Sequence, residues 1–154
     1  MICYLIRHGK DDDTVRGGWS ESPLTDEGIL QVKRLSEKIL SNEQIHIDKI
    51  YTSDLPRAKQ TAEILSDALS IPFTESPEFR ETDNGVLAGM AHRLAKNNFP
   101  GYIGARWIGM SLTPAEKALA NFIIAFQRHG LISKRKHKNQ IVTLHLSHTA
   151  VLST

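Results

Sequence analysis

Apolar residues in this chain gather in short runs that are separated by stretches with helical spacing. Residues 2–6 form one such run, as expected for a buried strand, and residues 47–52 form a second. Between them, apolar residues recur every three or four positions as far as residue 40. Thr25 stands in front of this stretch as a candidate cap. The pattern therefore predicts a strand, a capped helix and a second strand.

The same alternation continues along the chain. Residues 56–69 have the pattern of a helix, residues 71–73 form a short extended piece, and residues 140–146 form a last strand. Residues 113–128 are predicted to be helical from the spacing of Leu119, Phe122, Ile123 and Phe126. Alternating strands and helices favour an α/β sandwich with a largely parallel sheet. In such a sheet, functional residues collect at the carboxyl ends of the strands.

Composition limits the class of protein. A length of 154 residues fits one domain spanning 1–154, and Cys3 is the one cysteine, so a disulfide framework is excluded. The chain has no apolar run of the roughly 20 residues that a membrane span needs. The apolar start ends at Arg7 and is too short for a signal-peptide core. We therefore expect a cytoplasmic protein without a membrane partner.

Charge is distributed unevenly between the two parts of the chain. Residues 1–100 hold 12 Lys and Arg against 16 Asp and Glu, whereas residues 101–154 hold seven against one, Glu116. Such a split is seen in nucleic-acid-binding arms, and residues 134–138 are the densest basic run. That run contains no aromatic residues on which bases could stack. A solvated loop explains it better, and we expect no nucleic-acid partner.

Two basic side chains are placed for chemistry on a phosphate. His8 follows the first strand, next to Arg7 and Gly9, and an imidazole beside a guanidinium can attack phosphorus while the arginine neutralises phosphate oxygens. Arg57 falls in the first turn of the predicted helix at 56–69, where free N–H groups already favour an anion. The alternatives are a strand-end histidine bound to a carbonyl and a surface arginine.

Two further residues would complete such a site. Glu81 is a carboxylic acid that could protonate a leaving alcohol, although a solvated loop acid is the alternative. His148 comes just after the last predicted strand and could hold the transferring group from the other side. His145 and His148 lack a third ligand nearby, so a metal site is not expected.

Three motifs together resemble the histidine phosphatase superfamily, which includes the phosphoglycerate mutases. They are Leu5-Ile6-Arg7-His8-Gly9, then Ser22-Pro23-Leu24-Thr25-Asp26-Glu27-Gly28, and then Ser53-Asp54-Leu55-Pro56-Arg57-Ala58 within residues 51–62. The resemblance covers residues 1–100. It implies a three-layer α/β/α sandwich with a mostly parallel central sheet, like that of the phosphoglycerate mutases but truncated at its C-terminal end.

The resemblance also implies a mechanism with a phosphohistidine intermediate. His8 matches the nucleophile, Arg7 and Arg57 match the residues that bind the phosphoryl group, and Glu81 matches the general acid. His148 falls where the family has its second histidine. No metal or organic cofactor is implied, and the partner is a small phosphorylated substrate.

The loop after His8 bears on the type of reaction. Mutases of the family usually carry a serine-containing, Trp-Asn-rich stretch there, whereas this chain has Asp11, Asp12 and Asp13. This difference favours a phosphatase, and the three aspartates would repel a strongly anionic substrate unless they point away. Arg16 is a candidate additional phosphate ligand. A mutase-type phosphotransferase is an alternative.

Residues 101–154 are atypical for the family. A one-base frameshift near Gly101 is our hypothesis, because new codons built from the last base of each codon and the first two bases of the next permit the family's Pro-Gly-Gly-Glu-Ser over residues 113–118. The same shift permits a His-Gly-Gly segment from residues 145–152, and it would explain the shortage of acids. Such a tail could leave a catalytically inactive relative that binds anions or a partner. It would also expose part of the sheet, from which we expect self-association into a homodimer.

Overall fold

A single five-stranded sheet is the centre of the molecule. The computed structural model describes residues 2–99, 122–127 and 140–144. The strands lie in the order β3-β2-β4-β1-β5. Their bounds are β1 Ile2–Arg7, β2 Lys49–Thr52, β3 Phe73–Glu75, β4 Phe122–Gln127 and β5 Gln140–Leu144.

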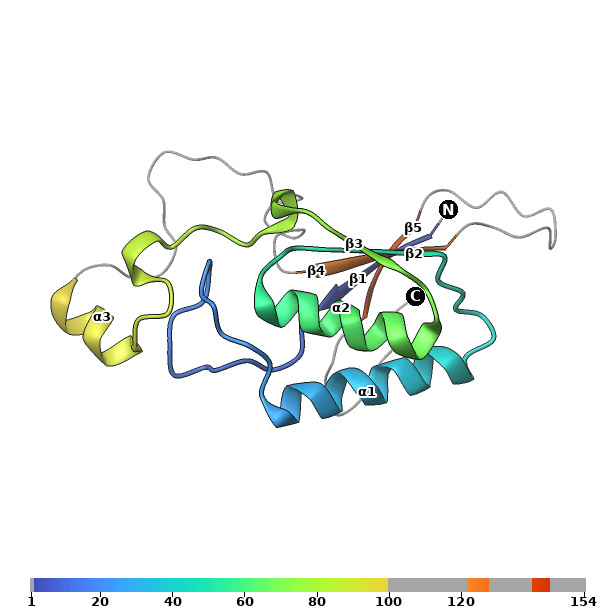
Figure 1. The fold of residues 1–154 in the computed structure, drawn as a ribbon, viewed down its shortest axis with the longest axis horizontal. Helices are drawn as coiled ribbons and strands as arrows, with labels where there is room; N and C mark the ends of the chain where they lie inside the picture. Colours follow the sequence, from blue (N-terminus) through green and yellow to red (C-terminus); the bar gives the residue numbers. More distant parts are fainter. Residues whose placement is uncertain (1, 100–121, 128–139, 145–154) are drawn as a thin grey trace.

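Four of the five strands run in the same direction. β1 is parallel to β5 and β2 is parallel to β3, whereas β4 lies between β1 and β2 and is antiparallel to both. The sheet is therefore mostly parallel, as predicted, with one reversed strand at its centre. Figure 1 shows that helices α1 and α2 lie side by side along this sheet.

β4 corrects the helix predicted over residues 113–128. Residues 122–127 of that range are a strand, and the remainder lies outside the described residues. Three of the four positions that suggested a helical period lie in the continuous apolar run 122–126, which is rich in aromatic and β-branched residues and also fits a buried strand. Ile123 is fully buried in the core. The spacing of apolar residues could not distinguish a helix from a strand here, and pairing of residues 122–127 with β1 and β2 makes them a strand.

Helix α1, Asp26–Ser41, forms as predicted. Thr25 caps it by accepting a hydrogen bond from the Gly28 N–H at 3.1 Å, and Asp26 and Glu27 add favourable negative charge to the first turn. Its buried face carries Val32, Leu35 and Ile39.

Helix α2, Pro56–Leu69, also has its predicted bounds. Pro56 fits the first turn because proline lacks the N–H that would be left unpaired there. The helix buries Ala62 and Leu65 and ends at Ser70, which adopts a left-handed conformation with φ 56°. The core between the two helices and the sheet consists of Tyr4, Ile6, Leu24, Val32, Leu35, Ile39, Ile47, Ile50, Ala62, Leu65 and Ile123.

The fold belongs to the α/β class. Among the described residues, α1 and α2 are the helical layer that packs beside the sheet (Figure 1). Strand ends differ from the predictions by one or two residues. β2 starts at Lys49 instead of residue 47, and β3 starts at Phe73 because the preceding Pro72 has no N–H to offer a neighbouring strand.

A long segment leads from β3 back across the carboxyl ends of the strands. It contains two single 3₁₀ turns, η1 at Pro77–Phe79 and η2 at Gly85–Leu87, and the short helix α3 at His92–Asn98. Figure 1 shows α3 at the end of the molecule opposite to the N-terminus. Within the described residues, no helix is long and apolar enough to cross a membrane.

The loop after β1 packs directly on the start of α1. A Cβ added to Gly28 would lie 2.1 Å from the carbonyl oxygen of Lys10, and one added to Gly9 would lie 2.6 Å from that of Gly28. The same Lys10 carbonyl accepts a hydrogen bond from the Thr25 N–H at 2.9 Å. Backbone therefore contacts backbone here, and the loop that carries His8 is fixed to the helix.

We expect Gly28→Ala to destabilise the protein. In an ordinary helix this change stabilises by roughly 1 kcal/mol, but here the methyl group would force α1 away from Lys10, which costs about 1–3 kcal/mol. The measurement is the midpoint of urea unfolding. Gly17→Ala is the control, because its added Cβ would meet nothing closer than 3.9 Å. A stabilised Gly28→Ala protein would show that the loop does not hold the helix.

Candidate active site

His8 is the first residue after β1, at the carboxyl end of that strand. The backbone at this point is held from α2, because the Gly9 N–H donates to the Thr61 hydroxyl at 3.1 Å. That hydroxyl in turn donates to the Arg57 carbonyl at 2.8 Å. The chain segment carrying His8 is thus attached to the first turn of the helix that carries Arg57.

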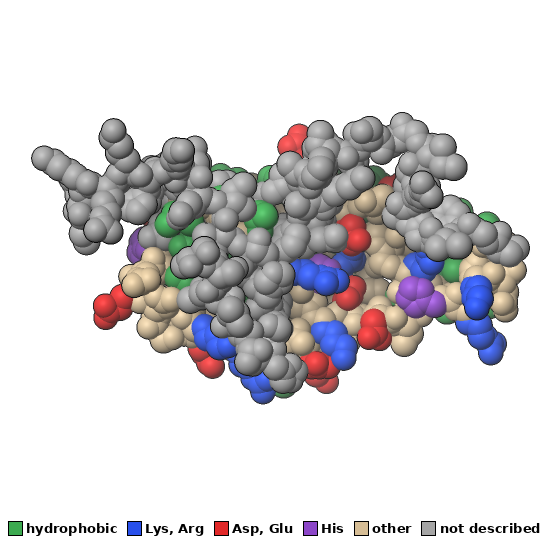
Figure 2. Space-filling view, turned by 180° about the vertical axis from the view of Figure 1, so that it is seen from behind, with side chains coloured by type: hydrophobic (Ala, Val, Ile, Leu, Met, Phe, Trp, Pro, Cys, Tyr) green, Lys and Arg blue, Asp and Glu red, His purple; other side chains and the backbone are tan. Residues whose placement is uncertain are grey.

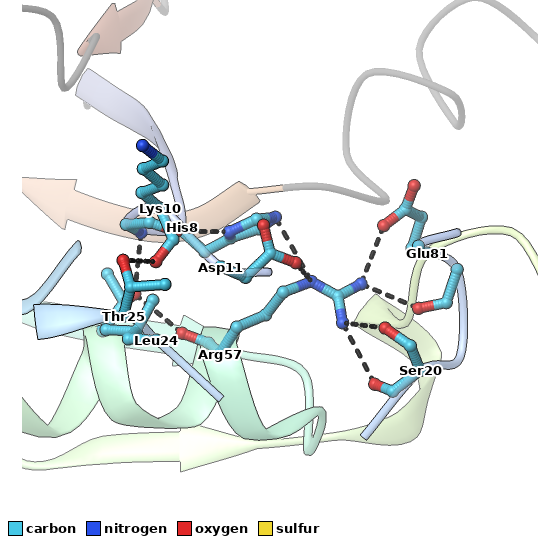
Figure 3. A network of polar contacts seen from close by, with 12 residues as sticks. His8, Lys10, Asp11, Ser20, Leu24, Thr25, Arg57 and Glu81 are labelled. Carbon is cyan, nitrogen blue, oxygen red and sulfur yellow. Dashed lines mark hydrogen bonds and ion pairs between the residues drawn. The ribbon is translucent and has the colours of Figure 1, made fainter. Parts of the chain in front are cut away.

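The contacts of His8 define which ring nitrogen can act as a nucleophile. Nδ1 lies 2.7 Å from the Gly9 carbonyl oxygen, which can only accept, so Nδ1 carries the proton. Nε2 lies 3.3 Å from Nε of Arg57, which can only donate. The neutral tautomer with its lone pair on Nε2 satisfies both contacts. Figure 3 shows the imidazole facing the guanidinium group in this way.

Burial lowers the pKa of His8, and the positive charges of Arg57 and Arg7 lower it further. The Gly9 carbonyl and the Asp11 carboxylate act in the opposite direction, but the net shift of the pKa is downward. The neutral imidazole with a free Nε2 lone pair is therefore favoured near neutral pH.

We expect the pKa of His8 to lie below 6.5, the ordinary value for histidine, so that its ring is mostly neutral at pH 6.5. As pH falls through the lowered pKa, protonation removes the Nε2 lone pair and the acid side of the activity profile declines. An NMR titration of the His8 ring measures this directly, with His8→Ala identifying the signal. A His8 midpoint at or above pH 6.5 would contradict the expectation.

Arg57 is the centre of the site and is almost fully buried, with 2% of its surface exposed. Its Nη1 donates to the carbonyl and hydroxyl of Ser20, at 3.2 and 3.3 Å. Its Nη2 donates to the Gly18 carbonyl at 2.7 Å and to Oε2 of Glu81 at 2.8 Å. Only the Nε edge of the guanidinium remains, and it faces His8.

Glu81 is placed by a second arginine and a tryptophan. Arg80, its neighbour, binds both carboxylate oxygens of Asp54, with the Nε contact at 2.6 Å. The Arg80 guanidinium also lies 4.8 Å from the centre of the Trp19 ring, and the Trp19 N–H donates to the Glu81 carbonyl at 2.6 Å. These contacts fix the Glu81 backbone and hold its carboxylate against Arg57.

Asp11 is the residue of the site that the sequence analysis did not assign. Its Oδ2 lies 3.5 Å from Arg57 Nε, on the edge that faces His8. Its backbone forms an isolated antiparallel bridge with Leu24. The sequence showed three adjacent aspartates, but it did not indicate which of them points inward.

The structure thus brings together three of the predicted residues, His8, Arg57 and Glu81. Arg7 ends β1 and is exposed. Arg16 lies on the loop whose backbone hydrogen-bonds with Gly89 and Met90, at 2.8 and 2.9 Å. His148 lies outside the described residues, as does His145. Gly18 and Ser20, which hold Arg57, were not singled out from the sequence.

Metal ligands are a separate question. Among residues 2–99, 122–127 and 140–144, no group of three or more His, Cys, Asp or Glu side chains is arranged to hold a metal ion. The polar groups around His8 are instead a buried guanidinium and two carboxylates. This set suits chemistry on a phosphate ester, because the guanidinium can donate hydrogen bonds to phosphate oxygens and a carboxylic acid beside it can supply a proton.

The chain belongs to the histidine phosphatase superfamily, branch 1, whose family model matches residues 3–152. That match extends well past Pro100, where the sequence analysis placed the end of the resemblance. A relative from Proteus mirabilis, named probable phosphoglycerate mutase GpmB, is 40% identical over 90 residues, which cover 56% of this chain and 40% of the relative. The chain thus spans well under half the length of the curated relatives it matches.

Solved structures give the same fold. Bacillus stearothermophilus YhfR is 29% identical with a TM-score of 0.54, over 63% of this chain and 48% of that one. The alpha-ribazole phosphatase from Shigella flexneri is 25% identical with a TM-score of 0.54, over 62% and 47%. A mycobacterial glucosyl-3-phosphoglycerate phosphatase, in complex with inorganic phosphate, is 27% identical with a TM-score of 0.51, over 65% and 45%.

Proposed function

We propose that this protein is a phosphatase that hydrolyses a small phosphomonoester through a phosphohistidine on His8. One observation supports this above the others: the unprotonated Nε2 of His8 lies 3.3 Å from the Nε of buried Arg57. A phosphoryl oxygen bound by Arg57 Nε–H would bring phosphorus next to the nitrogen lone pair. Arg7, which follows Ile6 at the end of β1, adds a second positive charge near His8.

The reaction has two steps. In the first, His8 Nε2 attacks phosphorus, the bond from phosphorus to the ester oxygen breaks, and Glu81 gives its proton to the leaving alkoxide. In the second, water attacks the phosphohistidine, Glu81 takes a proton from that water, and the bond between phosphorus and Nε2 breaks. The products are an alcohol and inorganic phosphate, and no cofactor is consumed. His148 is the proposed second imidazole.

The loop after β1 supports hydrolysis over transfer to a second substrate, because it carries Asp11, Asp12 and Asp13 in place of the serine-containing, Trp-Asn-rich stretch that is usual in mutases of the family. The curated relatives named as probable mutases support the second candidate, a phosphoglycerate mutase-type phosphotransferase. An inactive relative that binds anions is the third. We place the protein in the cytoplasm, since Cys3 is the single cysteine and no disulfide is needed.

Product analysis separates these functions. The purified chain is incubated with p-nitrophenyl phosphate and, separately, with 3-phosphoglycerate. A phosphatase releases inorganic phosphate from at least one of these compounds. A mutase converts 3-phosphoglycerate to its 2-phospho isomer without net release of phosphate. Binding of phosphate without either product would indicate the inactive relative and would overturn the proposal.

A further inference from the structure

Asp11 competes for the same edge of Arg57 that a phosphoryl group needs. The four N–H bonds on Nη1 and Nη2 point to Ser20, Gly18 and Glu81. The remaining N–H, on Nε, faces both His8 Nε2 at 3.3 Å and Asp11 Oδ2 at 3.5 Å. A phosphoryl group that approaches His8 along this edge must therefore come within a few ångströms of a carboxylate.

The other two aspartates of the loop do not occupy this position. Asp12 accepts hydrogen bonds from the N–H and the hydroxyl of Thr14, at 2.9 and 2.6 Å, and so closes its own turn. Asp13 is exposed and lies near Lys10. Asp11 has 22% of its side chain exposed and is held by the backbone bridge to Leu24.

Apart from Arg57, two further cations of this region are already engaged by other carboxylates. Lys10 is paired with Glu27 at 2.6 Å, and Arg80 is held by Asp54. At the phosphoryl site itself, Arg57 is the buried cation and is already paired with Asp11 and Glu81, whereas Arg7 is exposed and adds one positive charge near His8. Figure 2 shows acidic side chains interspersed with basic ones on the face drawn there, rather than one basic field.

We infer that Asp11 determines specificity by selecting against phosphomonoesters whose leaving group carries further negative charge. Arg57, with the positive charge of Arg7 nearby, can accommodate the phosphoryl dianion, whereas an additional carboxylate on the substrate would be repelled by Asp11. The favoured substrates are phosphomonoesters with an uncharged or cationic leaving group. This inference rests on the proposed phosphatase function and narrows its substrate class.

The test uses Asp11→Asn with Asp13→Asn as the matched control, because both remove one charge from the same loop. Inhibition by inorganic phosphate is measured for each protein, together with KM for p-nitrophenyl phosphate and for 3-phosphoglycerate. We expect Asp11→Asn to bind inorganic phosphate about tenfold more tightly than the wild type. We also expect it to lower KM more for 3-phosphoglycerate than for p-nitrophenyl phosphate. Asp13→Asn should change each value by less than about twofold.

The possible outcomes separate this inference from the function beneath it. Equal changes of phosphate inhibition and KM in Asp11→Asn and Asp13→Asn would overturn the inference, because the total charge of the loop would then explain them. Weaker phosphate binding by Asp11→Asn would also overturn it. Calorimetry of phosphate binding tests the effect of Asp11 even if the protein hydrolyses no ester. Absence of hydrolysis alone would overturn only the proposed phosphatase activity. If neither wild type nor variant binds phosphate, both proposals fail. Asp11→Ser serves as a second variant if the amide does not fold.

Discussion

Replacing His8 by alanine is expected to abolish phosphate release, with a loss of kcat on the order of 10³-fold or more. The reason is that Nε2 is the one atom placed both to attack phosphorus and to lie beside the guanidinium that holds it. Without the imidazole, no covalent intermediate forms and water must react directly. The measurement is phosphate release under saturating p-nitrophenyl phosphate, together with acid-labile phosphoryl label trapped on the protein.

Fold integrity is the main control for this variant. His46→Ala removes a histidine whose side chain is 78% exposed and whose nearest carboxylate, on Asp48, is 3.8 Å away, so it should leave both rate and label unchanged. His8→Ala should unfold at a similar urea concentration, because its ring makes one contact to backbone and one to Arg57. If His8→Ala kept a substantial rate or still trapped label, another nucleophile would be responsible.

Replacing Arg57 by alanine is expected to damage both activity and stability. The substitution removes the donor next to Nε2, which should lower kcat/KM by about 10²–10³-fold. It also leaves the Gly18 and Ser20 carbonyls without their donor and the Glu81 carboxylate without its cation, at a cost of about 3 kcal/mol in the free energy of unfolding. Urea unfolding and steady-state kinetics measure the two effects separately.

Two further variants serve as controls for the Arg57→Ala prediction. Arg57→Lys keeps the charge but cannot make the forked contacts to Gly18 and Ser20, so its loss of activity should be intermediate. Lys59→Ala, on the same helix, removes an exposed pair with Glu75 and should change the stability by less than about 0.5 kcal/mol. If Arg57→Ala were as stable and active as Lys59→Ala, Arg57 would not be the centre of the site.

Local signals in the sequence were sufficient for the elements that carry the site. The Thr25 cap and the apolar spacing behind it predicted α1, and Pro56 with the spacing after it predicted α2 with its observed bounds. His8 and Arg57 could be predicted as partners because each follows a strand of the same sheet. The carboxyl ends of strands that run in one direction meet at one edge.

Features that depend on distant contacts could not be predicted in this way. The run around Ile123 fitted both a helix and a strand, and its pairing with β1 and β2 decided between them. Asp11 was indistinguishable from Asp12 and Asp13 in the sequence, since all three have the same side chain. The bridge to Leu24 and the position of Arg57 single it out.

The central position of β4 has a consequence for how the protein comes into being on the ribosome. β1 and β2, which lead to His8 and Arg57, are separated in the sheet by a strand that is synthesised about 70 residues after β2. During synthesis, α1 and α2 can form early, but β1 has no strand neighbour until residues 122–127 emerge. Until then β1 and β2 are not joined in one sheet, and the apolar strand edges that β4 later covers are surfaces of the kind that chaperones bind.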